Sequence, residues 1–365
     1  MNGSNHMGLL GLKDVKELTE WTPNTLINDH IRNSGEDIAI SKLFTNVSAS
    51  IIFWMTDKGD IYANGKWKNK GSTKDGYIPQ LVSLSLQEKH PIDIVVTPNY
   101  KYKNYDMFAL CISPNTDNEG LNDILSYWSE NKQIPGDVIA IINSYYDIRI
   151  LRGSEIYECV DEIDSPWELI EFEKDVIVTN IACGLEFMLF LSNEGTVYSK
   201  GTNKYGQCGV DRKGNKGRPI HLVSWSFSDN IIVQICCGDE HCLALTNDGN
   251  VYSWGRNTWG QCGREADDEF KSVALFKPEF IDDLMEFEII EIAAAKDNSY
   301  AKSNDNKHWL WGDNKWGQCT LKTRNKTKDN DEIREPYRID DIFYKKTKRE
   351  IDQVYLGYQA VYIIA

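Results

Sequence analysis

Hydrophobic and polar positions recur along the second half of the chain in long, similar units. A unit opens with an apolar run such as IIVQICCG (231–238) and continues with an alternating run, HCLALT (241–246). After Asn247-Asp248-Gly249 it resumes as NVYSWG. An Asx-Gly pair between two β-rich runs favours a hairpin, because glycine accepts the positive φ of such turns. A further apolar run follows near Pro219, Pro278 and Pro336. Each unit is therefore predicted to form four short antiparallel strands.

The element G-x-N-x-aromatic-G-Q-C marks the period of these units. It begins at Gly201, Gly255 and Gly312, in steps of 54 and 57 residues. It closes three segments that align throughout, residues 183–209, 237–263 and 294–320. Repeated four-stranded units of this length are typical of β-propeller blades.

Weaker copies extend the pattern to both ends of the chain. TDKGDIYANG (56–65) matches TNDGNVYSWG, and GSNHMGLLG (3–11) has the spacing of GRNTWGQCG (255–263). The final VYLGYQAVYIIA supplies the first two strands of a blade. Joining the two ends would pair strands that are otherwise open edges. We predict an all-β, seven-bladed β-propeller closed by N- and C-terminal strands sharing one blade, which is short of an obvious third strand. The single domain, 1–365, would have blades at 36–85, 90–135, 137–172, 176–228, 231–286, 288–343, and 350–365 plus 1–35.

Composition narrows the function classes. The 365 residues are 41% hydrophobic and 11% aromatic, enough for a large core, yet no run of about 18 apolar residues indicates a membrane span. The net charge of −15 opposes direct nucleic-acid binding, which depends on neutralising phosphates. Nine cysteines and no visible export signal favour reduced thiols and a cytoplasmic or nuclear location.

The cysteines and histidine of the repeats do not form a reactive or metal-binding pattern. Cys208, Cys262 and Cys319 share one repeat position, which fits small buried side chains better than three nucleophiles. The CC-x4-C run around His241 lacks the paired C-x2-C spacing of structural zinc sites. We therefore predict no catalytic residues, no metal and no cofactor.

The remaining repeat residues have structural explanations. The glycines at 201, 255 and 312 lack the Lys-Ser/Thr end of a phosphate-binding loop. We expect His241 to tie neighbouring blades or strands by a hydrogen bond. We expect Asn257 and Gln261 to form turn and inter-blade hydrogen bonds.

Loops are a better place to look for function than the repeat itself. In each unit, two residues after the CG position turn the first strand into the second, and we expect these turns to gather on one face. They are mostly acidic or aromatic, which suits a partner with basic residues, although solvated turns remain the alternative. The candidate partner-binding residues are Tyr145, Glu186, Asp239, Glu240, Asp297 and Tyr358.

Two basic segments are further candidates. A charged loop, 320–336, contains Lys322, Arg324, Lys326 and Lys328 in its first half. A second group lies at Lys345, Lys346, Lys348 and Arg349. Either group could contact RNA or an acidic partner, or could simply be solvated.

The run CG-x-x-H-x-L-A-L-T-x-D-G-x-V-Y-x-W-G-x-N-x-x-G-Q-x-G (237–263) resembles the repeat of the regulator-of-chromosome-condensation propellers. That resemblance implies a seven-bladed ring closed by both termini. The founding members exchange nucleotide on the small GTPase Ran and bind nucleosomes, whereas others are scaffolds.

The layout of the chain is similar to a compact fungal branch, the alpha-tubulin-suppressor or killer-toxin-insensitivity propeller. That branch partners a small zinc protein in tRNA wobble modification by Elongator and in diphthamide synthesis. The resemblance thus implies a non-catalytic scaffold that docks a small zinc-binding protein, as a monomer or heterodimer. The alternative is a guanine-nucleotide exchange factor for a Ran-like GTPase. The start of the repeat at residue 3 counts against chromatin docking.

Overall fold

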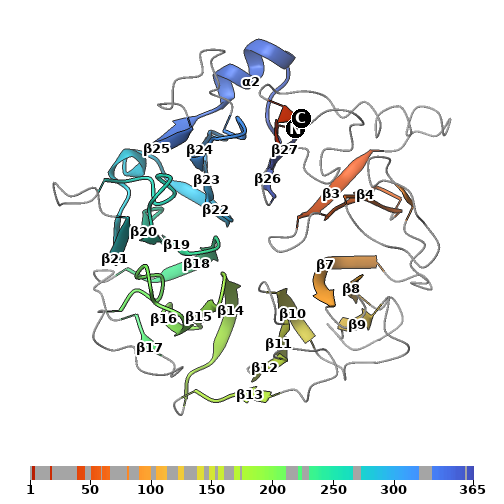
Figure 1. The fold of residues 1–365 in the computed structure, drawn as a ribbon, viewed down its shortest axis with the longest axis vertical. Helices are drawn as coiled ribbons and strands as arrows, with labels where there is room; N and C mark the ends of the chain where they lie inside the picture. Colours follow the sequence, from red (N-terminus) through yellow and green to blue (C-terminus); the bar gives the residue numbers. More distant parts are fainter. Residues whose placement is uncertain are drawn as a thin grey trace. The chain divides into compact units, whose positions relative to one another are not determined.

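The computed structural model divides the chain into two compact units. The first contains residues 1, 3–17 and 22–171, and the second contains residues 2, 18–21 and 172–365 (Figure 1). The structure describes residues 2–4, 17–18, 39–45, 51–58, 60–65, 80–81, 90–99, 104–112, 122–126, 138–143, 148–152, 155–159, 168–172, 175–210, 221–223, 230–265, 273–319, 331–357 and 360–365.

Apart from one α-helix and one 3₁₀ turn, the regular elements of the described residues are strands, which form seven sheets. Six of these sheets follow the order of the chain as antiparallel meanders, and six sheets have four strands. The all-β prediction is confirmed. The three sheets of the first unit are β3 (Ile40–Thr45), β4 (Ile51–Thr56), β5 (Ile61–Gly65) and β6 (Gln80–Leu81); β7 (His90–Asn99), β8 (Asn104–Ile112) and β9 (Asn122–Ser126); and β10 (Val138–Asn143), β11 (Ile148–Arg152), β12 (Glu155–Cys159) and β13 (Glu168–Ile170).

The three strong sequence repeats form three successive sheets of the second unit. Strand β18 packs against β14 and β15 of the preceding sheet, and β22 packs against β18 and β19. These sheets are β14 (Val178–Cys183), β15 (Phe187–Ser192), β16 (Val197–Gly201) and β17 (His221–Leu222); β18 (Ile232–Cys237), β19 (His241–Thr246), β20 (Val251–Arg256) and β21 (Ala274–Phe280); and β22 (Ile289–Ala295), β23 (Asn298–Ser303), β24 (His308–Asp313) and β25 (Glu332–Arg338).

The remaining sheet combines strands from both ends of the chain. Its order is β2-β1-β27-β26, so β1 lies between β2 and β27. The sheet has four strands, so no strand is missing: β1 overlaps the start of the GSN element at Gly3 and Ser4 and supplies the strand that was not obvious from the sequence. The strands are β1 (Asn2–Ser4), β2 (Glu17–Leu18), β26 (Gln353–Leu356) and β27 (Ala360–Ile364).

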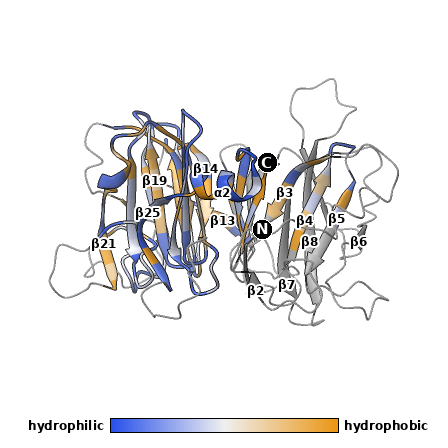
Figure 2. Cartoon of the chain, turned by 90° about the horizontal axis from the view of Figure 1, so that it is seen from above, coloured by the Kyte–Doolittle hydropathy of each residue, from blue (hydrophilic) through white to orange (hydrophobic). Residues whose placement is uncertain are grey.

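Strand β19 shows why the repeats pack as they do. All six of its residues are buried, because each face of the strand is covered by a neighbouring sheet. Cys242 and Ala244 belong to the core shared with the preceding sheet, whereas Leu243 and Leu245 belong to the core shared with the following one. Figure 2 shows hydrophobic residues in the strands of this unit and hydrophilic residues in the connecting turns.

The hairpins repeat the same local geometry. Gly195 and Gly249 adopt φ values of 76° and 84° in the turn before the third strand. The corresponding residue of the next repeat is Asn306, at φ 57°, and asparagine is one of the few residues that tolerates this region. The first strand of each repeat also has a bulge near its start, at Ile232/Gln234 and Ile289/Glu291.

Residues 340–347 form a helix, α2 (Asp340–Thr347), that the strand pattern did not predict. Asp340 and Asp341 in its first turn and Lys345 and Lys346 in its last turn complement the helix dipole. The basic group at 345–349 therefore lies on a helix and its end. A 3₁₀ turn, η3 (Asp282–Leu284), follows β21.

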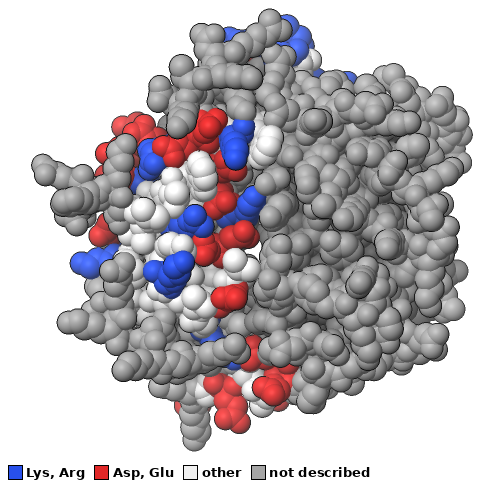
Figure 3. All heavy atoms as spheres, viewed as in Figure 1, with Lys and Arg blue, Asp and Glu red and all other residues white. Residues whose placement is uncertain are grey.

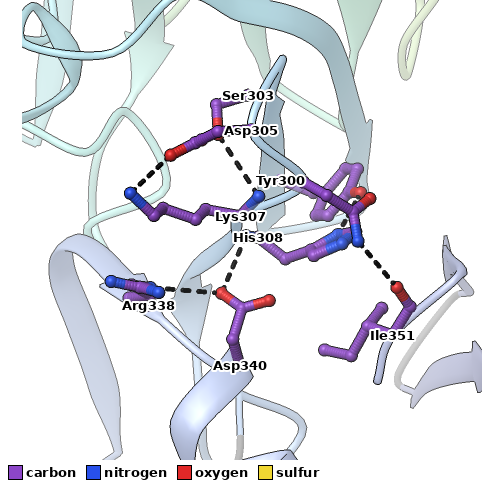
Figure 4. Close-up of polar contacts among 9 residues, drawn as sticks. Tyr300, Ser303, Asp305, Lys307, His308, Arg338, Asp340 and Ile351 are labelled. Atoms are coloured by element: carbon purple, nitrogen blue, oxygen red, sulfur yellow. Dashed lines mark hydrogen bonds and ion pairs between the residues drawn. The ribbon is translucent and has the colours of Figure 1, made fainter.

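Helix α2 is tied to the neighbouring hairpin (Figure 4). The Asp340 carboxylate accepts a hydrogen bond from the His308 backbone N–H at 3.0 Å and from Arg338 Nε at 3.3 Å. Asn306 Nδ2 donates to the Ile351 carbonyl at 3.2 Å. The predicted loop 320–336 is also shorter than expected, because β25 begins at Glu332. Residues 320–330 lie outside the described residues.

Candidate functional site

The turns between first and second strands are linked in a series across three sheets. The Leu185 N–H donates to the Asp239 carbonyl at 2.7 Å, and the Asp239 N–H donates to the Lys296 carbonyl at 2.8 Å. Residues that are 54 and 57 positions apart in the sequence are thereby neighbours in space. We call Leu185, Glu186, Asp239, Glu240, Lys296 and Asp297 the turn surface.

Two carboxylates of the turn surface, Asp239 and Asp297, are half-buried. Burial and, to a smaller extent, nearby Asp297 raise the pKa of Asp239 to about 7, whereas Lys296 opposes the shift. Burial likewise raises the pKa of Asp297 to about 6, against the attraction of Lys296 and Arg256. Gln261 Nε2 donates to Asp297 Oδ1 at 2.9 Å, so this carboxylate has one fixed partner.

Glu240 and Glu186 are held in a different way. Glu240 forms an ion pair of 2.5 Å with Arg256, whose guanidinium also lies 5.1 Å from the centre of the Tyr205 ring. Glu186 is exposed at φ 59° and accepts a 3.4 Å hydrogen bond from the Thr202 hydroxyl. Acidic and basic side chains lie next to one another over the described part of the face in Figure 3.

Three glycines of the repeat lie in close contact with the backbone of these turns. Gly201, Gly255 and Gly312 adopt φ values of 118°, 105° and 107°. A Cβ at these positions would lie 2.4, 2.5 and 2.1 Å from the carbonyl oxygens of Glu186, Glu240 and Asp297. Glycine is thus needed where the third strand approaches the turn.

The other repeat residues form the framework behind the surface. The Asn257 Oδ1 accepts from the Cys262 N–H at 3.0 Å, and the Gln261 Oε1 accepts from the Trp259 N–H at 2.8 Å. His241 Nε2 is 2.8 Å from Ser299 Oγ of the next sheet. Burial lowers the pKa of His241 to about 3, so the ring is neutral. A neutral, buried histidine in this position holds two sheets together.

The structure brings four of the six candidate residues together: Glu186, Asp239, Glu240 and Asp297. Tyr145 and Tyr358 lie outside the described residues. Sequence reasoning missed Lys296 and Arg256, which flank the acidic residues. Lys296 directly precedes Asp297, and Arg256 directly follows Gly255. Their adjacency to residues already singled out in the repeat could have identified them from the sequence.

The buried cysteines have no reactive environment. Cys208, Cys262 and Cys319 are fully buried, which confirms the expected burial. Burial raises the pKa of Cys208 and of Cys262 to about 12. Within the described ranges, no group of three or more histidine, cysteine or acidic side chains is arranged to hold a metal. No helix there has the length and apolar character to cross a membrane.

A surface cavity of about 380 Å³ lies beside helix α2. Its charged groups are largely paired with one another, as Figure 4 shows for Lys307 with Asp305 and Arg338 with Asp340. These pairs leave little unmatched charge for a ligand, so the turn surface is the stronger candidate.

Consecutive four-stranded sheets with a shared repeat define a β-propeller type of protein. Solved structures agree: over 98% of this chain and 88% of theirs, Prp20p from Saccharomyces cerevisiae superposes with a TM-score of 0.74 at 16% identity. Human WBSCR16 superposes over 89% of this chain and 86% of its own with a TM-score of 0.66, also at 16% identity. The fold is that of the RCC1 propellers.

The chain carries regulator of chromosome condensation (RCC1) repeats. Models of this repeat match residues 178–207 and 232–261, and residues 194–245 and 248–301. A probable E3 ubiquitin-protein ligase, human HERC6, is 33% identical over 165 residues, which is 45% of this chain and 15% of HERC6. An RCC1 repeat-containing protein of Dictyostelium discoideum is 29% identical over 155 residues, 41% of this chain and 31% of that protein. The similarity therefore covers less than a third of either curated relative.

Proposed function

We propose that this protein is a non-catalytic interaction scaffold that docks a basic segment of a small partner protein on the turn surface. One observation carries the proposal: three hydrogen-bonded turns present Asp239 and Asp297 as half-buried carboxylates. Lys296 and Arg256 attract both carboxylates, yet both pKa values stay raised. Burial is the main cause of both raised pKa values, and Asp297 adds to that of Asp239, so a cationic side chain from a partner would favour the ionised form of both carboxylates.

The finer form of the proposal concerns architecture and pathway. The seven sheets are proposed to be the blades of one closed ring formed by residues 1–365. We further propose that the partner is a small zinc-binding protein. The complex would take part in tRNA wobble modification and diphthamide synthesis, in the cytosol or nucleus. The support is the resemblance to the compact fungal propellers.

A matched set of variants tests the docking surface. Asp239→Asn and Asp297→Asn remove charge from the turn surface, whereas Asp283→Asn removes charge from an exposed residue of η3. Each full-length variant would be used for affinity capture from native extract, with quantitative identification of the captured proteins. We expect a small basic protein to be lost from the two turn variants and retained by the control. Equal capture by all three would contradict the docking site.

Nucleotide exchange on a small GTPase is the second candidate function. The fold similarity to Prp20p favours it, since that protein is described by its binding to Gsp1p and histones. An exchange factor acts by binding, so the absence of a catalytic triad among the described residues is compatible with it. The test is release of a fluorescent guanine nucleotide from a Ran-like GTPase in the presence of the full chain. Acceleration that Asp239→Asn removes would support exchange, and an unchanged rate would eliminate it.

A further inference from the structure

Two buried thiols face each other at the end of the β18–β19 hairpin, next to the turn that contains Asp239 and Glu240. Cys237, the last residue of β18, is paired in register with Cys242 of β19. Their sulfur atoms are 3.9 Å apart. Between them lie four residues, 238–241, which include Asp239 and Glu240 of the turn surface.

The ladder geometry suits a bond between these sulfurs. The Gly238 N–H donates to the His241 carbonyl at 2.9 Å, so positions 238 and 241 are the hydrogen-bonded pair nearest the turn. Pairs alternate along an antiparallel ladder, which makes Cys237 and Cys242 a non-hydrogen-bonded pair. Such pairs have Cα atoms roughly 4.5 Å apart, within the range of about 4.4–6.8 Å that disulfides span.

The surroundings of the pair favour this partner over other thiols. Cys237 and Cys242 lie in the same core cluster, whereas Cys236 packs against the cluster on the opposite face of the sheet. Cys236 is instead paired with Leu243. Cys208 belongs to the same core cluster but comes from the preceding repeat, and its Sγ contacts the Thr202 carbonyl at 3.3 Å. Side-chain direction therefore singles out one pair among the four thiols.

We propose that Cys237 and Cys242 are an oxidisable dithiol that closes to a cross-strand disulfide under peroxide. Two S–H bonds break and one S–S bond forms. The two electrons and two protons pass to one hydrogen peroxide molecule, which becomes two waters. Both thiols are buried, and burial raises the pKa of Cys242 well above its usual range, so the reaction requires transient opening of the hairpin.

Disulfide closure would act on the turn that the pair encloses. The sulfurs must approach from 3.9 Å to a bond of about 2.0 Å, and the new bond would restrain the ends of β18 and β19. The same four-residue turn forms the backbone links to Leu185 and Lys296. Oxidation would therefore alter the turn surface. An effect of oxidation on docking rests on the proposed function, but formation of the disulfide does not depend on that function.

The test uses the reduced full chain, oxidised with hydrogen peroxide and then alkylated with N-ethylmaleimide under denaturing conditions. Cleavage after Glu240 separates Cys242 from the peptide that holds Cys236 and Cys237, so the disulfide appears as two linked peptides by mass spectrometry, and fragmentation of the linked pair shows which of the two cysteines is bonded. We expect loss of two alkylatable thiols and linkage of Cys237 to Cys242. Cys236→Ser and Cys183→Ser should retain this loss, whereas Cys237→Ser should abolish it.

Two results would overturn the proposal. One is retention of all thiols by the wild-type chain at peroxide concentrations that oxidise free cysteine, both in native buffer and in urea that opens the hairpin. The other is linkage to Cys236 or Cys208 instead. The wild-type mapping does not depend on whether a variant folds. Hydrogen exchange at Leu185 and Asp239, compared between oxidised and reduced protein, reports the effect on the turn without any partner, and unchanged exchange would contradict that effect.

Discussion

At the scale of single residues, the glycines of the repeat and the acidic residues of the turn depend on each other. Gly255 lies at φ 105° with the Glu240 carbonyl only 2.5 Å from the position of a Cβ. Gly249 also has a positive φ, 84°, but the next repeat has Asn306 in the corresponding turn. The two glycines therefore differ in purpose: one allows close approach, and the other allows a backbone conformation.

Substitution should separate these two roles. Gly255→Ala is expected to lower the free energy of unfolding by about 3 kcal/mol, because a strained φ and a backbone clash combine. Gly249→Asn is expected to cost less than about 1 kcal/mol, since asparagine accepts that conformation. Urea unfolding of both variants measures the difference. Similar losses at both positions would show that the close approach to Glu240 does not matter.

Ionisation of Asp239 is expected to lower the free energy of unfolding. Its pKa is about 7 in the folded chain against an ordinary 3.8, so ionisation opposes folding and stability falls as pH rises between these values. Asp239→Asn removes this penalty. We expect the variant to be more stable than the wild type by about 1–2 kcal/mol at pH 8 and nearly equal at pH 4, with the partly hydrated site limiting the gain.

Urea unfolding at the two pH values measures this effect. Asp283→Asn, at an exposed position, serves as the control and should show little difference at either pH. A variant at 239 that is less stable than the wild type at pH 8 would contradict the assigned shift.

At the scale of elements, polar side chains join one sheet to the next. Gln234 on β18 donates from Nε2 to the Ile292 carbonyl of β22 at 2.9 Å and accepts from the Ile292 N–H at 3.0 Å. His241 to Ser299, and Trp311 to the Gln261 carbonyl at 3.0 Å, link the same two sheets. The sheets are thus connected by specific hydrogen bonds as well as by apolar packing.

Removing the Gln234 amide should weaken this connection. Gln234→Met keeps the length of the side chain but leaves the Ile292 N–H and carbonyl without their partner, at a cost of about 2 kcal/mol. Val233→Met, at an exposed position of the same strand, controls for the change in side chain. The measurement is the urea midpoint of each variant. Equal midpoints would show that water replaces the amide at no cost.

Much of the element structure followed from local sequence. Hairpins were predictable because Asn247-Asp248-Gly249 and its copies specify a turn by backbone preference alone. Helix α2 was missed because only Phe343 of its eight residues is buried, so it has almost no apolar periodicity. The start of β25 inside a charged stretch was missed for a similar reason, since none of its residues is fully buried.

At the scale of the whole molecule, the sheet β2-β1-β27-β26 joins strands from the two ends of the chain. Its C-terminal strands contribute Leu356, Val361 and Tyr362 to the buried core, and β26 packs against β22 and β23. Deleting residues 353–365 removes both strands and exposes that apolar contact. We expect the thermal midpoint to fall by about 10 °C or more, or the cooperative transition to be lost. An unchanged midpoint in calorimetry would refute this role.

The sequence by itself determined the repeat, the strand order within each repeat and most of the residues that form the turns. These features depend on residues close together in the chain. Only the tertiary structure decided which turns are neighbours, as when the Asp239 N–H meets the Lys296 carbonyl. It alone decided that Asp239 is half-buried beside Asp297, and that Cys237 faces Cys242 while Cys236 faces away. The physical reason is that burial and charge proximity arise when separate sheets pack against each other, whereas the facing of Cys237 and Cys242 depends on the register of one hairpin.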